Sequence, residues 1–482
     1  MKRVVVVGGG IGGLASAALL GRAGHHVTLL EASGSLGGKS RRIELDGQRI
    51  DTGPSLVTFP GVWDEFLRRW DALGAGNDAT EVAGLKLQRM DEVGRYYFRG
   101  DVASLPVEKG HAWYEAWERF AGIHGRLGPE VSRLLTADPL DRATLPALRR
   151  LLRIYGARLT TRGYLDSLKW LPEGLREVIA IHTLNAGVSP SRTPALYASM
   201  PAIMASDGVW ASEGGVYEIV RSLEKLARSV GVEIHTGEPV QKISPGKVFT
   251  QNGAHQADAV VSGLDPERLE ALISPGEDRS PGKLSCSGVA IYGPLREELP
   301  SNLSTHSVVL PSDPSALYSA LEANQEPDQT MAFVNYYRPG EVYPNEKATL
   351  ALLLTAPANG RNYDIEDPFV MREVERVSRE VGLPRPATDY LEEYVVLHPR
   401  YFGGWGSAGG ALYGAVHPFW RSGPLHRPRY TGRRRPWLWR VGASVHPGGG
   451  IPAVLGGAMI STNRLLRTLR GTRSPSNQWS KI

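Results

Sequence analysis

Cysteine is almost absent from this sequence, because Cys286 is the only one in 482 residues. A single thiol excludes an intramolecular disulfide and a metal site built mainly from cysteine, and it fits a reducing compartment. We therefore expect a cytoplasmic protein without a metal site. Long hydrophobic runs are also missing, since no stretch offers the ~18 uninterrupted apolar residues of a transmembrane helix. No membrane-spanning segment is predicted.

Acidic residues are missing from the last part of the chain. Residues 394–482 contain no Asp or Glu and thirteen Lys or Arg, so this tail carries +13. The whole chain carries +5, which leaves −8 for residues 1–393. Such a tail can bind acidic partners, but no recognised nucleic-acid-binding module accompanies the charge. Nucleic acid is therefore not an expected partner.

A second basic region, residues 141–171, interleaves leucines with arginines. It holds seven basic and two acidic residues and reads DRATLPALRRLLRIYGARLTTRGYLDSLKWL. One interpretation is a helix that lies on a membrane surface, apolar on one side and rich in arginine on the other. The other is a helix that packs its leucines into the core and exposes a solvated basic face. The sequence leaves both open.

The first 31 residues contain a cluster of glycines between two predicted strands. Two basic residues and an apolar run imitate a signal peptide, but five of the ten residues from Gly8 to Ala17 are Gly, which suits a tight turn. The β-branched run Val4–Val7 predicts a buried parallel strand. A helix follows to about Ala23, and a second strand ends at Glu31. We therefore predict a βαβ unit.

The spacing of these residues is that of a dinucleotide-binding fingerprint. Gly8, Gly10 and Gly13 form GxGxxG, and Glu31 lies 21 residues after Gly10. The glycines permit the turn, the approach of a pyrophosphate and close packing of helix on strand. The helix N-terminus, which includes Ile11 and Gly12, presents free N–H groups to phosphate. Glu31 can accept hydrogen bonds from ribose hydroxyls.

A second GxGxxG match occurs at residues 404–409, in the sequence GWGSAG. No helical pattern follows it, and no acidic residue lies downstream. The structural context that gives the motif its meaning is therefore missing. We predict one nucleotide site, and NAD(P)H is not expected as a second nucleotide.

The residues after Glu31 indicate which dinucleotide binds. A short loop with Gly37, Gly38 and Lys39 leads into a hairpin that turns at Asp46-Gly47, and residues 51–60 read DTGPSLVTFP. This arrangement resembles the flavin-containing amine oxidase and carotenoid desaturase superfamily, in which the acid is followed by Gly-Gly-Arg. The resemblance implies FAD as the cofactor. Lys39 replaces the usual Arg, which keeps a positive charge but loses the planar fork.

Three stretches narrow the resemblance to the carotenoid desaturases. They are residues 51–60, residues 212–243, and the stretch VGASVHPGGGIPAVLGGAM at residues 441–459. In the last, Pro452 suits the first turn of a helix whose N-terminus would face the flavin ring. The motif and the resemblance together imply a cofactor site formed by Gly8, Gly10, Ile11, Gly12, Gly13, Glu31, Ala32, Gly37, Gly38, Lys39, Gly53, Pro54, Ser55, Val240, Gly442, Gly450, Ile451 and Pro452.

The activity that the resemblance implies is desaturation of a carotenoid, in which a hydride leaves an allylic carbon for the flavin. His446 is the candidate catalytic residue at the ring, with a purely structural role as its alternative. Glu213 is a second candidate base, and a solvated acid is its alternative. Oxygen or a quinone is the expected electron acceptor. A lipophilic substrate implies a protein that associates peripherally with a membrane.

Several alternatives remain within and beyond this family. The sequence is slightly closer to the 3,4-desaturases of hydroxylated or methoxylated carotenoids than to phytoene desaturases. Carotenoid isomerases and saturases and, more distantly, amine oxidases share the fold and cofactor. A non-catalytic lipid-binding module, similar to the GDP dissociation inhibitors of prenylated GTPases, is the non-enzyme alternative.

We expect an α/β architecture in which a discontinuous Rossmann-like FAD-binding domain carries an α+β substrate domain. The FAD-binding domain is predicted from residues 1–80, 213–275 and 405–482. The substrate domain is predicted from residues 81–212 and 276–404, with long helical stretches over residues 110–200 and a strand within residues 347–356.

Overall fold

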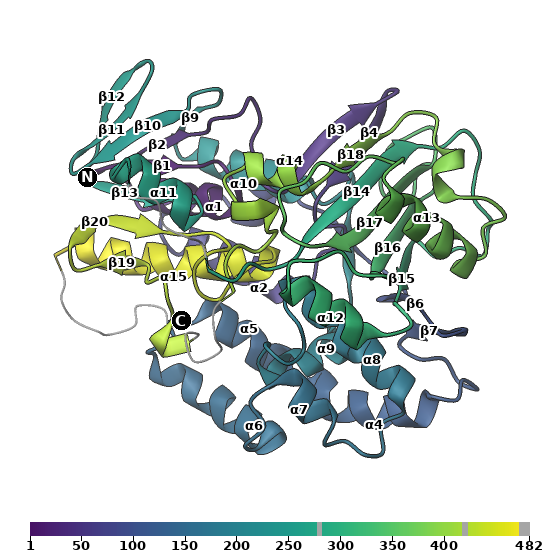
Figure 1. The fold of residues 1–482 in the computed structure, drawn as a ribbon. Coiled ribbons are helices and arrows are strands. Elements are labelled where there is room, and N and C mark those ends of the chain that lie inside the picture. Colours follow the sequence, from purple (N-terminus) through teal and green to yellow (C-terminus); the bar gives the residue numbers. More distant parts are fainter. Residues whose placement is uncertain (277–281, 417–422, 472–482) are drawn as a thin grey trace.

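The computed structural model describes residues 1–276, 282–416 and 423–471. Two large β-sheets lie side by side in Figure 1, the six-stranded sheet on the left and the seven-stranded sheet on the right. A group of helices, α4 to α9, lies below them. The main hydrophobic core extends from the helices of the first sheet into this helical group.

The six-stranded sheet has the order β19-β20-β13-β1-β2-β9, and only β19 runs antiparallel to its neighbour. The valines of β1 are almost completely buried, as expected for a central parallel strand. Strands from both ends of the chain therefore meet in one sheet. The strands are β1 (Arg3–Val7), β2 (His26–Leu30), β9 (Glu233–His235), β13 (Ala259–Ser262), β19 (Thr431–Gly432) and β20 (Arg435–Arg440).

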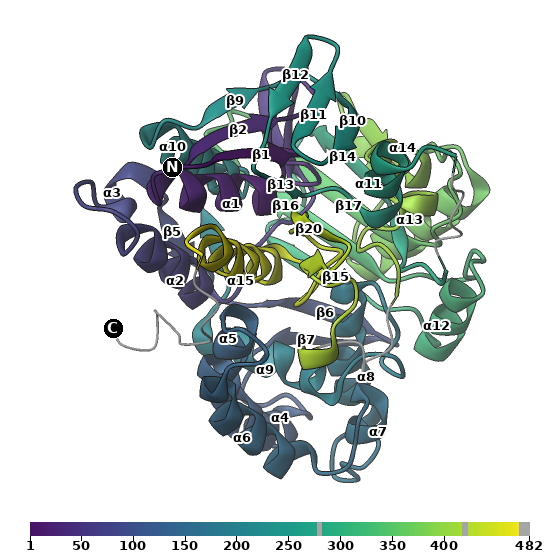
Figure 2. The ribbon, with the colours of Figure 1, turned by 90° about the vertical axis from the view of Figure 1, so that its left-hand side faces the viewer.

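Helices α1 (Ile11–Arg22), α10 (Glu218–Ser229) and α15 (Ile451–Leu469) pack together beside this sheet. Figure 2 shows α15, near the C-terminus, next to α1, near the N-terminus. Eleven of the twelve residues of α1 are buried, which explains why glycine, alanine and leucine dominate it. The predicted βαβ unit is confirmed, with α1 ending one residue before the expected Ala23. A small sheet of β10 (Val240–Ser244), β11 (Lys247–Thr250) and β12 (Gly253–Gln256) lies beyond the large sheet.

The seven-stranded sheet has the order β18-β14-β17-β16-β15-β6-β7, and all neighbours except β15 and β6 are antiparallel. The strand expected within residues 347–356 is confirmed as β17. The strands are β6 (Gly94–Phe98), β7 (Asp101–Leu105), β14 (Ser287–Pro294), β15 (His306–Val309), β16 (Ala332–Tyr337), β17 (Thr349–Ala356) and β18 (Val395–Leu397).

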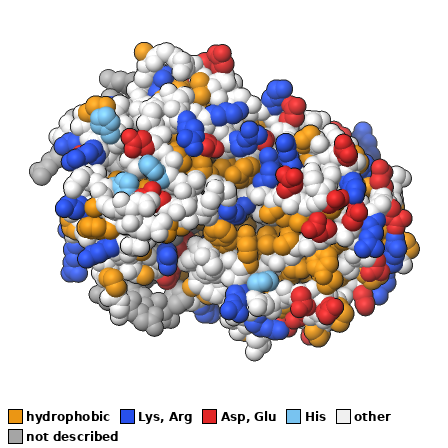
Figure 3. All heavy atoms as spheres, turned by 90° about the horizontal axis from the view of Figure 1, so that it is seen from above, with side chains coloured by type: hydrophobic (Ala, Val, Ile, Leu, Met, Phe, Trp, Pro, Cys, Tyr) orange, Lys and Arg blue, Asp and Glu red, His pale blue; other side chains and the backbone are white. Residues whose placement is uncertain are grey.

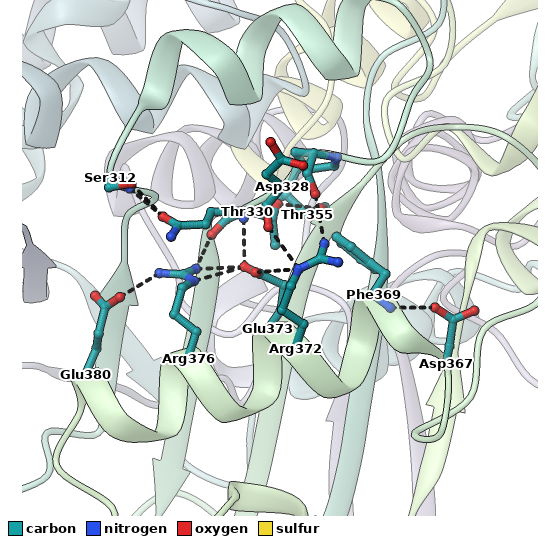
Figure 4. Close-up of polar contacts among 12 residues, drawn as sticks. Ser312, Asp328, Thr330, Thr355, Asp367, Phe369, Arg372, Glu373, Arg376 and Glu380 are labelled. Carbon is teal, nitrogen blue, oxygen red and sulfur yellow. Dashed lines mark hydrogen bonds and ion pairs between the residues drawn. The ribbon is translucent and has the colours of Figure 1, made fainter.

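Helix α13 (Pro368–Glu380) covers this sheet and carries a buried ion pair, shown in Figure 4. The Glu373 side chain is completely buried, and its Oε2 accepts hydrogen bonds from the Thr330 N–H and from Arg376 Nη2, at 2.7 and 2.9 Å. Arg376 also donates to the Thr330 and Leu310 carbonyls. The network therefore joins α13 to the loops at the ends of the strands.

The helical group confirms the long helical stretches expected over residues 110–200. The basic segment at residues 141–171, however, is not one helix, because Gly156 has φ = 59° and ends α6. A short α7 follows after five residues. The helices are α4 (Tyr114–His124), α5 (Gly128–Thr136), α6 (Leu145–Tyr155), α7 (Thr161–Leu165), α8 (Glu173–Ile181) and α9 (Met200–Asp207).

The predicted hairpin at residues 46–47 is confirmed between β3 (Arg41–Leu45) and β4 (Gln48–Thr52), with φ positive at both turn residues. The remaining α-helices and strands are α2 (Pro60–Asp71), α3 (Ala79–Ala83), β5 (Leu87–Arg89), β8 (Trp210–Ser212), α11 (Pro266–Ile273), α12 (Pro314–Glu322) and α14 (Pro399–Gly404).

Every strand of the six-stranded sheet lies within the three ranges predicted for the FAD-binding domain, and every strand of the seven-stranded sheet lies outside them. The domain limits themselves stay a prediction.

Candidate functional site

The turn between β1 and α1 requires glycine at several positions. Gly8 has φ = 99°, and a Cβ added to Gly13 would lie 2.0 Å from the Gly8 carbonyl oxygen. The turn therefore keeps the backbone of β1 in contact with the first turn of α1. The amides of that first turn, from Ile11 to Gly13, have no partner within the helix and face the end of the strand. This is the geometry of an anion site at a helix N-terminus.

A second glycine pair lies against this turn. Gly37 forms a β-bridge with Gly10 and donates its N–H to the Gly9 carbonyl at 2.9 Å. A Cβ added to Gly38 would lie 3.1 Å from Gly10 Cα. The two predicted glycine motifs are therefore adjacent in space.

Glycines from the C-terminal region reach the same place. A Cβ added to Gly12 would lie 2.9 Å from the Gly442 N atom. Gly448 and Gly450 have φ of 132° and 89°, and no atom lies within 4 Å of a Cβ added to either. The loop at residues 442–450 therefore touches the first turn on one side and borders open space on the other. We call the glycines at positions 8–13, 37–38 and 442–450 the glycine cradle.

Glu31 closes one end of the cradle. Its side chain is buried; Oε2 accepts the Gly9 N–H at 2.7 Å, and Oε1 accepts the N–H and the hydroxyl of Ser33 at 2.8 Å each. Ala32, between them, is exposed. Val240, the first residue of β10, is buried, and its strand is tied to Glu31 by the Glu238 N–H, which donates to the Glu31 carbonyl at 2.9 Å. These residues lie together, as the sequence predicts.

Lys39 turns toward the C-terminal segment. Its Nζ donates to the Leu412 carbonyl at 3.0 Å and pairs with Asp265 at 3.4 Å. Asp265 also accepts hydrogen bonds from Ser407, at 2.6 Å, and from Ser444. This carboxylate was missed in the sequence analysis. The available signal was its position just after β13, because the carboxyl ends of parallel strands border ligand sites in such sheets.

The segment Gly53–Ser55 lies behind Lys39. Gly53 has φ = 118°, and a Cβ there would lie 2.6 Å from the Lys39 carbonyl oxygen. The Gly53 N–H donates to the hydroxyl of Tyr292 on β14, at 3.3 Å. Pro54 and Ser55 follow, half-buried, toward the seven-stranded sheet. These residues therefore connect the cradle to the other half of the molecule.

Residues 404–416 run along the cradle, and we call them the strap. At one end the Arg41 guanidinium lies 4.0 Å from the centre of the Trp405 ring. At the other end Tyr413 touches the cradle, because a Cβ added to Gly449 would lie 2.4 Å from its Cδ1. The GWGSAG match within the strap, which sequence analysis set aside as a nucleotide site, is thus a neighbour of the first site.

His446 follows β20 and is partly buried beside a second histidine. Its ring stacks on that of His426 with 5.3 Å between centroids, and its carbonyl accepts the Tyr430 hydroxyl at 2.8 Å. Burial lowers the pKa of His446 to about 4, so the imidazole is neutral at neutral pH. The other candidate base, Glu213, is largely exposed and pairs with Lys86 at 3.3 Å. A catalytic role for either residue stays a prediction.

The N-terminus of α15 ends at the open side of the cradle. Gly450 is its N-cap, and Ile451 and Pro452 form its first turn, as predicted. The positive end of the helix dipole therefore faces the space beside Gly448 and Gly450. A dinucleotide with a flat ring system fits this arrangement, with N–H groups for a pyrophosphate, an acid for a ribose and side-chain-free backbone for the ring.

Comparison with known proteins agrees with this geometry. Residues 11–289, more than half of the chain, match the family described as flavin containing amine oxidoreductase. A zeta-carotene-forming phytoene desaturase of Myxococcus xanthus is 29% identical over 494 residues, covering 96% of this chain and 94% of that protein. A 4,4'-diapophytoene desaturase (4,4'-diaponeurosporene-forming) of Staphylococcus haemolyticus is 26% identical, covering 97% and 99%.

Solved structures of amine oxidases share the fold. Putrescine oxidase with bound putrescine gives a TM-score of 0.64 at 14% identity, over 98% of this chain and 99% of that chain. Cyclohexylamine oxidase from Brevibacterium oxydans gives 0.61 at 13% identity, over 97% and 99%. The expected α/β architecture is confirmed. The protein is an oxidoreductase whose cofactor is FAD, and the chain belongs to the flavin-containing amine oxidoreductase family.

Proposed function

We propose that the protein is an FAD-dependent carotenoid desaturase. The observation that carries this proposal is that the relatives named as phytoene and diapophytoene desaturases align over nearly the whole chain, from the cradle to α15. The amine oxidases are less similar in sequence, at 13–14% identity. The site residues named above are proposed to hold the cofactor.

The chemistry that FAD supplies when bound is acceptance of a hydride from an allylic carbon of the polyene. The chain's own residues position the substrate and the cofactor, shield the site from water and stabilise developing charge. The cradle brings backbone close to the ring, and the N-terminus of α15 stabilises negative charge that develops there. Loss of the hydride leaves a cation that the polyene spreads over its own double bonds, and loss of a proton from the neighbouring carbon then forms the new double bond. The protein therefore needs mainly to orient the polyene and exclude water. A neutral His446 fits this surrounding, because it adds no positive charge next to the substrate.

We further propose that the substrate enters from a membrane on which α6 lies. Leu145, Leu148 and Leu152 of α6 are 46%, 37% and 65% exposed, and Arg149 and Arg153, which follow two of them, are exposed too. These leucines point outward while Ala147, Leu151 and Tyr155 face the core. A leucine and arginine surface suits the acyl chains and anionic headgroups of a bilayer.

The opposite side of the molecule also carries hydrophobic side chains, but its charges are of both signs. The face seen in Figure 3, opposite to α6 in Figure 1, carries Lys and Arg side chains intermixed with Asp and Glu. Among the described residues, no helix has both the length and the apolar character needed to cross a bilayer. Oxygen or a quinone is the proposed electron acceptor. As the finer activity we propose 3,4-desaturation of a hydroxylated carotenoid.

Pigment analysis tests the proposed function. The purified protein should be yellow, and with vesicles that contain phytoene or a partly desaturated carotenoid it should produce pigments that absorb at longer wavelength. Yellow protein that leaves every such carotenoid unchanged, while oxidising an amine, would replace the proposal with an amine oxidase. A parallel assay without vesicles shows whether the enzyme needs the bilayer to receive its substrate. It therefore distinguishes a lack of substrate supply from a lack of activity.

A further inference from the structure

Three basic residues follow the second glycine pair, and acidic side chains neutralise two of them. Lys39 pairs with Asp265 at 3.4 Å. Arg42 pairs with Asp51 at 2.7 Å and with Glu218 at 2.9 Å. These two ion pairs are largely used within the protein, so neither Lys39 nor Arg42 brings an uncompensated charge to a ligand.

Arg41 is the third basic residue, and its partners are uncharged. Its Nη1 and Nη2 donate to the Ser33 hydroxyl at 3.4 and 3.5 Å, and Nη2 also donates to the Ser35 hydroxyl. Its guanidinium lies 4.0 Å from the centre of the Trp405 ring. Within the described ranges, no carboxylate forms an ion pair with it. Because burial of a charge costs free energy unless an opposite charge compensates it, this half-buried guanidinium favours an anionic ligand.

Arg41 also lies at the edge of the glycine cradle. The Ser33 hydroxyl, which Arg41 contacts, donates to Glu31 Oε1 at 2.8 Å, and Glu31 closes one end of the cradle. On the chain, Arg41 directly follows Ser40, whose carbonyl oxygen would lie 2.0 Å from a Cβ added to Gly37. The positive charge is therefore held beside the turn that presents N–H groups to phosphate.

We infer that Arg41 binds the pyrophosphate of FAD. This inference rests on the proposed cofactor site and adds to it a residue that the glycine motifs do not contain. The planar guanidinium can donate two parallel hydrogen bonds to phosphate oxygens. Arg41 thus supplies the fork that is lost where Lys39 replaces the usual arginine, and the ring of Trp405 makes the strap a part of the cofactor site.

Equilibrium binding to the flavin-free protein tests the inference, with FAD, ADP and riboflavin as probes. ADP contains a pyrophosphate without the ring system, and riboflavin contains the ring system without a pyrophosphate. Arg41→Gln should weaken the binding of FAD and of ADP by about ten- to a hundredfold, as expected for hydrogen bonds to a charged group. It should leave the affinity for riboflavin unchanged. Arg41→Lys should recover part of the loss, because it keeps the charge without the fork.

Quenching of flavin fluorescence measures the affinities for FAD and riboflavin, and competition with FAD measures that for ADP. Arg49→Gln is the matched control, since it removes one positive charge from an exposed position on the other strand of the same hairpin. It should bind all three probes like the wild type.

An ADP affinity that Arg41→Gln leaves unchanged would overturn the inference. Affinities for FAD and riboflavin that fall by the same factor would overturn it too, because Arg41 would then only hold the strap in place. No carotenoid is present in these assays, so either result is independent of whether the protein desaturates one.

Discussion

Gly12 lies where the N-terminal and C-terminal regions of the chain touch, and its position leaves no room for a larger side chain. An added Cβ would lie 2.9 Å from the N atom and 3.1 Å from the Cα of Gly442. Both are backbone atoms and cannot rotate away. The contact therefore depends on glycine for a steric reason, and the GxGxxG motif does not predict it, because Gly12 occupies one of its variable positions.

Gly12→Ala should lower the stability of the protein by about 1–3 kcal/mol through overpacking, and it should reduce the flavin content of the purified protein. Thermal unfolding and the ratio of flavin to protein absorbance measure both effects. Gly34→Ala is the control, because Gly34 lies in the same region with no atom within 4 Å of an added Cβ. Equal melting temperatures for the two variants would contradict this reading of the contact.

His446 makes stability depend on pH in a defined direction. Its pKa falls from 6.5 to about 4 on folding because burial disfavours the charged ring. The unfolded state therefore binds more protons between these values, and the free energy of unfolding should fall as pH decreases from about 6.5 to 4. His446→Gln should weaken this dependence. Denaturant titrations at pH 7.5 and 5 measure it, and an unchanged difference between the two pH values would show that other groups cause the loss.

At the scale of single elements, α13 shows how a helix with buried charge holds a sheet. Glu373 is completely buried and Arg376 is 5% exposed, and they form an ion pair at 2.9 Å in the core, with the more exposed Glu380 as a second partner of Arg376. Removing one partner of such a pair leaves an uncompensated charge in the core. The loss exceeds what the intact pair contributes, because the remaining group stays desolvated.

Glu373→Ala should therefore destabilise the protein by about 3–5 kcal/mol. Replacing both residues with apolar ones, as in Glu373→Leu with Arg376→Met, should cost less than the single change. Glu380→Gln is the control, since Glu380 contacts the same arginine but is about one-third exposed. Chemical denaturation measures all three, and a double variant as unstable as Glu373→Ala would refute the explanation.

Helix α6 exposes three leucines, whereas α13 exposes one large apolar side chain, that of Met371. Leu145→Glu with Leu152→Glu removes two of its exposed leucines and adds negative charge next to the arginines. Binding to anionic vesicles should weaken by at least about tenfold, from the loss of buried apolar area. Cosedimentation measures this.

Met371→Glu is the control for α6, because Met371 is 45% exposed on α13, far from α6 in Figure 1. It should bind vesicles like the wild type. If removal of the α6 leucines or arginines changes nothing, the membrane face lies elsewhere.

At the scale of the whole molecule, the features that could be predicted from the sequence are those determined by residues close together in the chain. The strand, turn and helix at Val4–Ala23, the hairpin at Asp46-Gly47 and the start of α15 at Pro452 each follow from residues close together in the chain. Asp265 and Tyr413 could not be found in this way. Their positions depend on strand order and on how the strap crosses from one half to the other.

The segment at residues 141–171 shows a different limit of prediction from sequence. Its periodicity favoured a single helix, and Gly156 divides it in two. Which of its leucines face outward could not be predicted either, because several registers of a short helix bury a similar number of apolar side chains. Only the packing of Ala147, Leu151 and Tyr155 against the helical group decides it.

The meeting of Gly12 with Gly442 also bears on how the protein is made. A ribosome has synthesised nine-tenths of the chain before residue 442 exists, and α15 comes later still. Until then the first turn of α1 lacks the backbone that covers it. The complete cradle can therefore hold the prosthetic group only after α15 has been synthesised, and a yellow protein would be one translated at least through that helix.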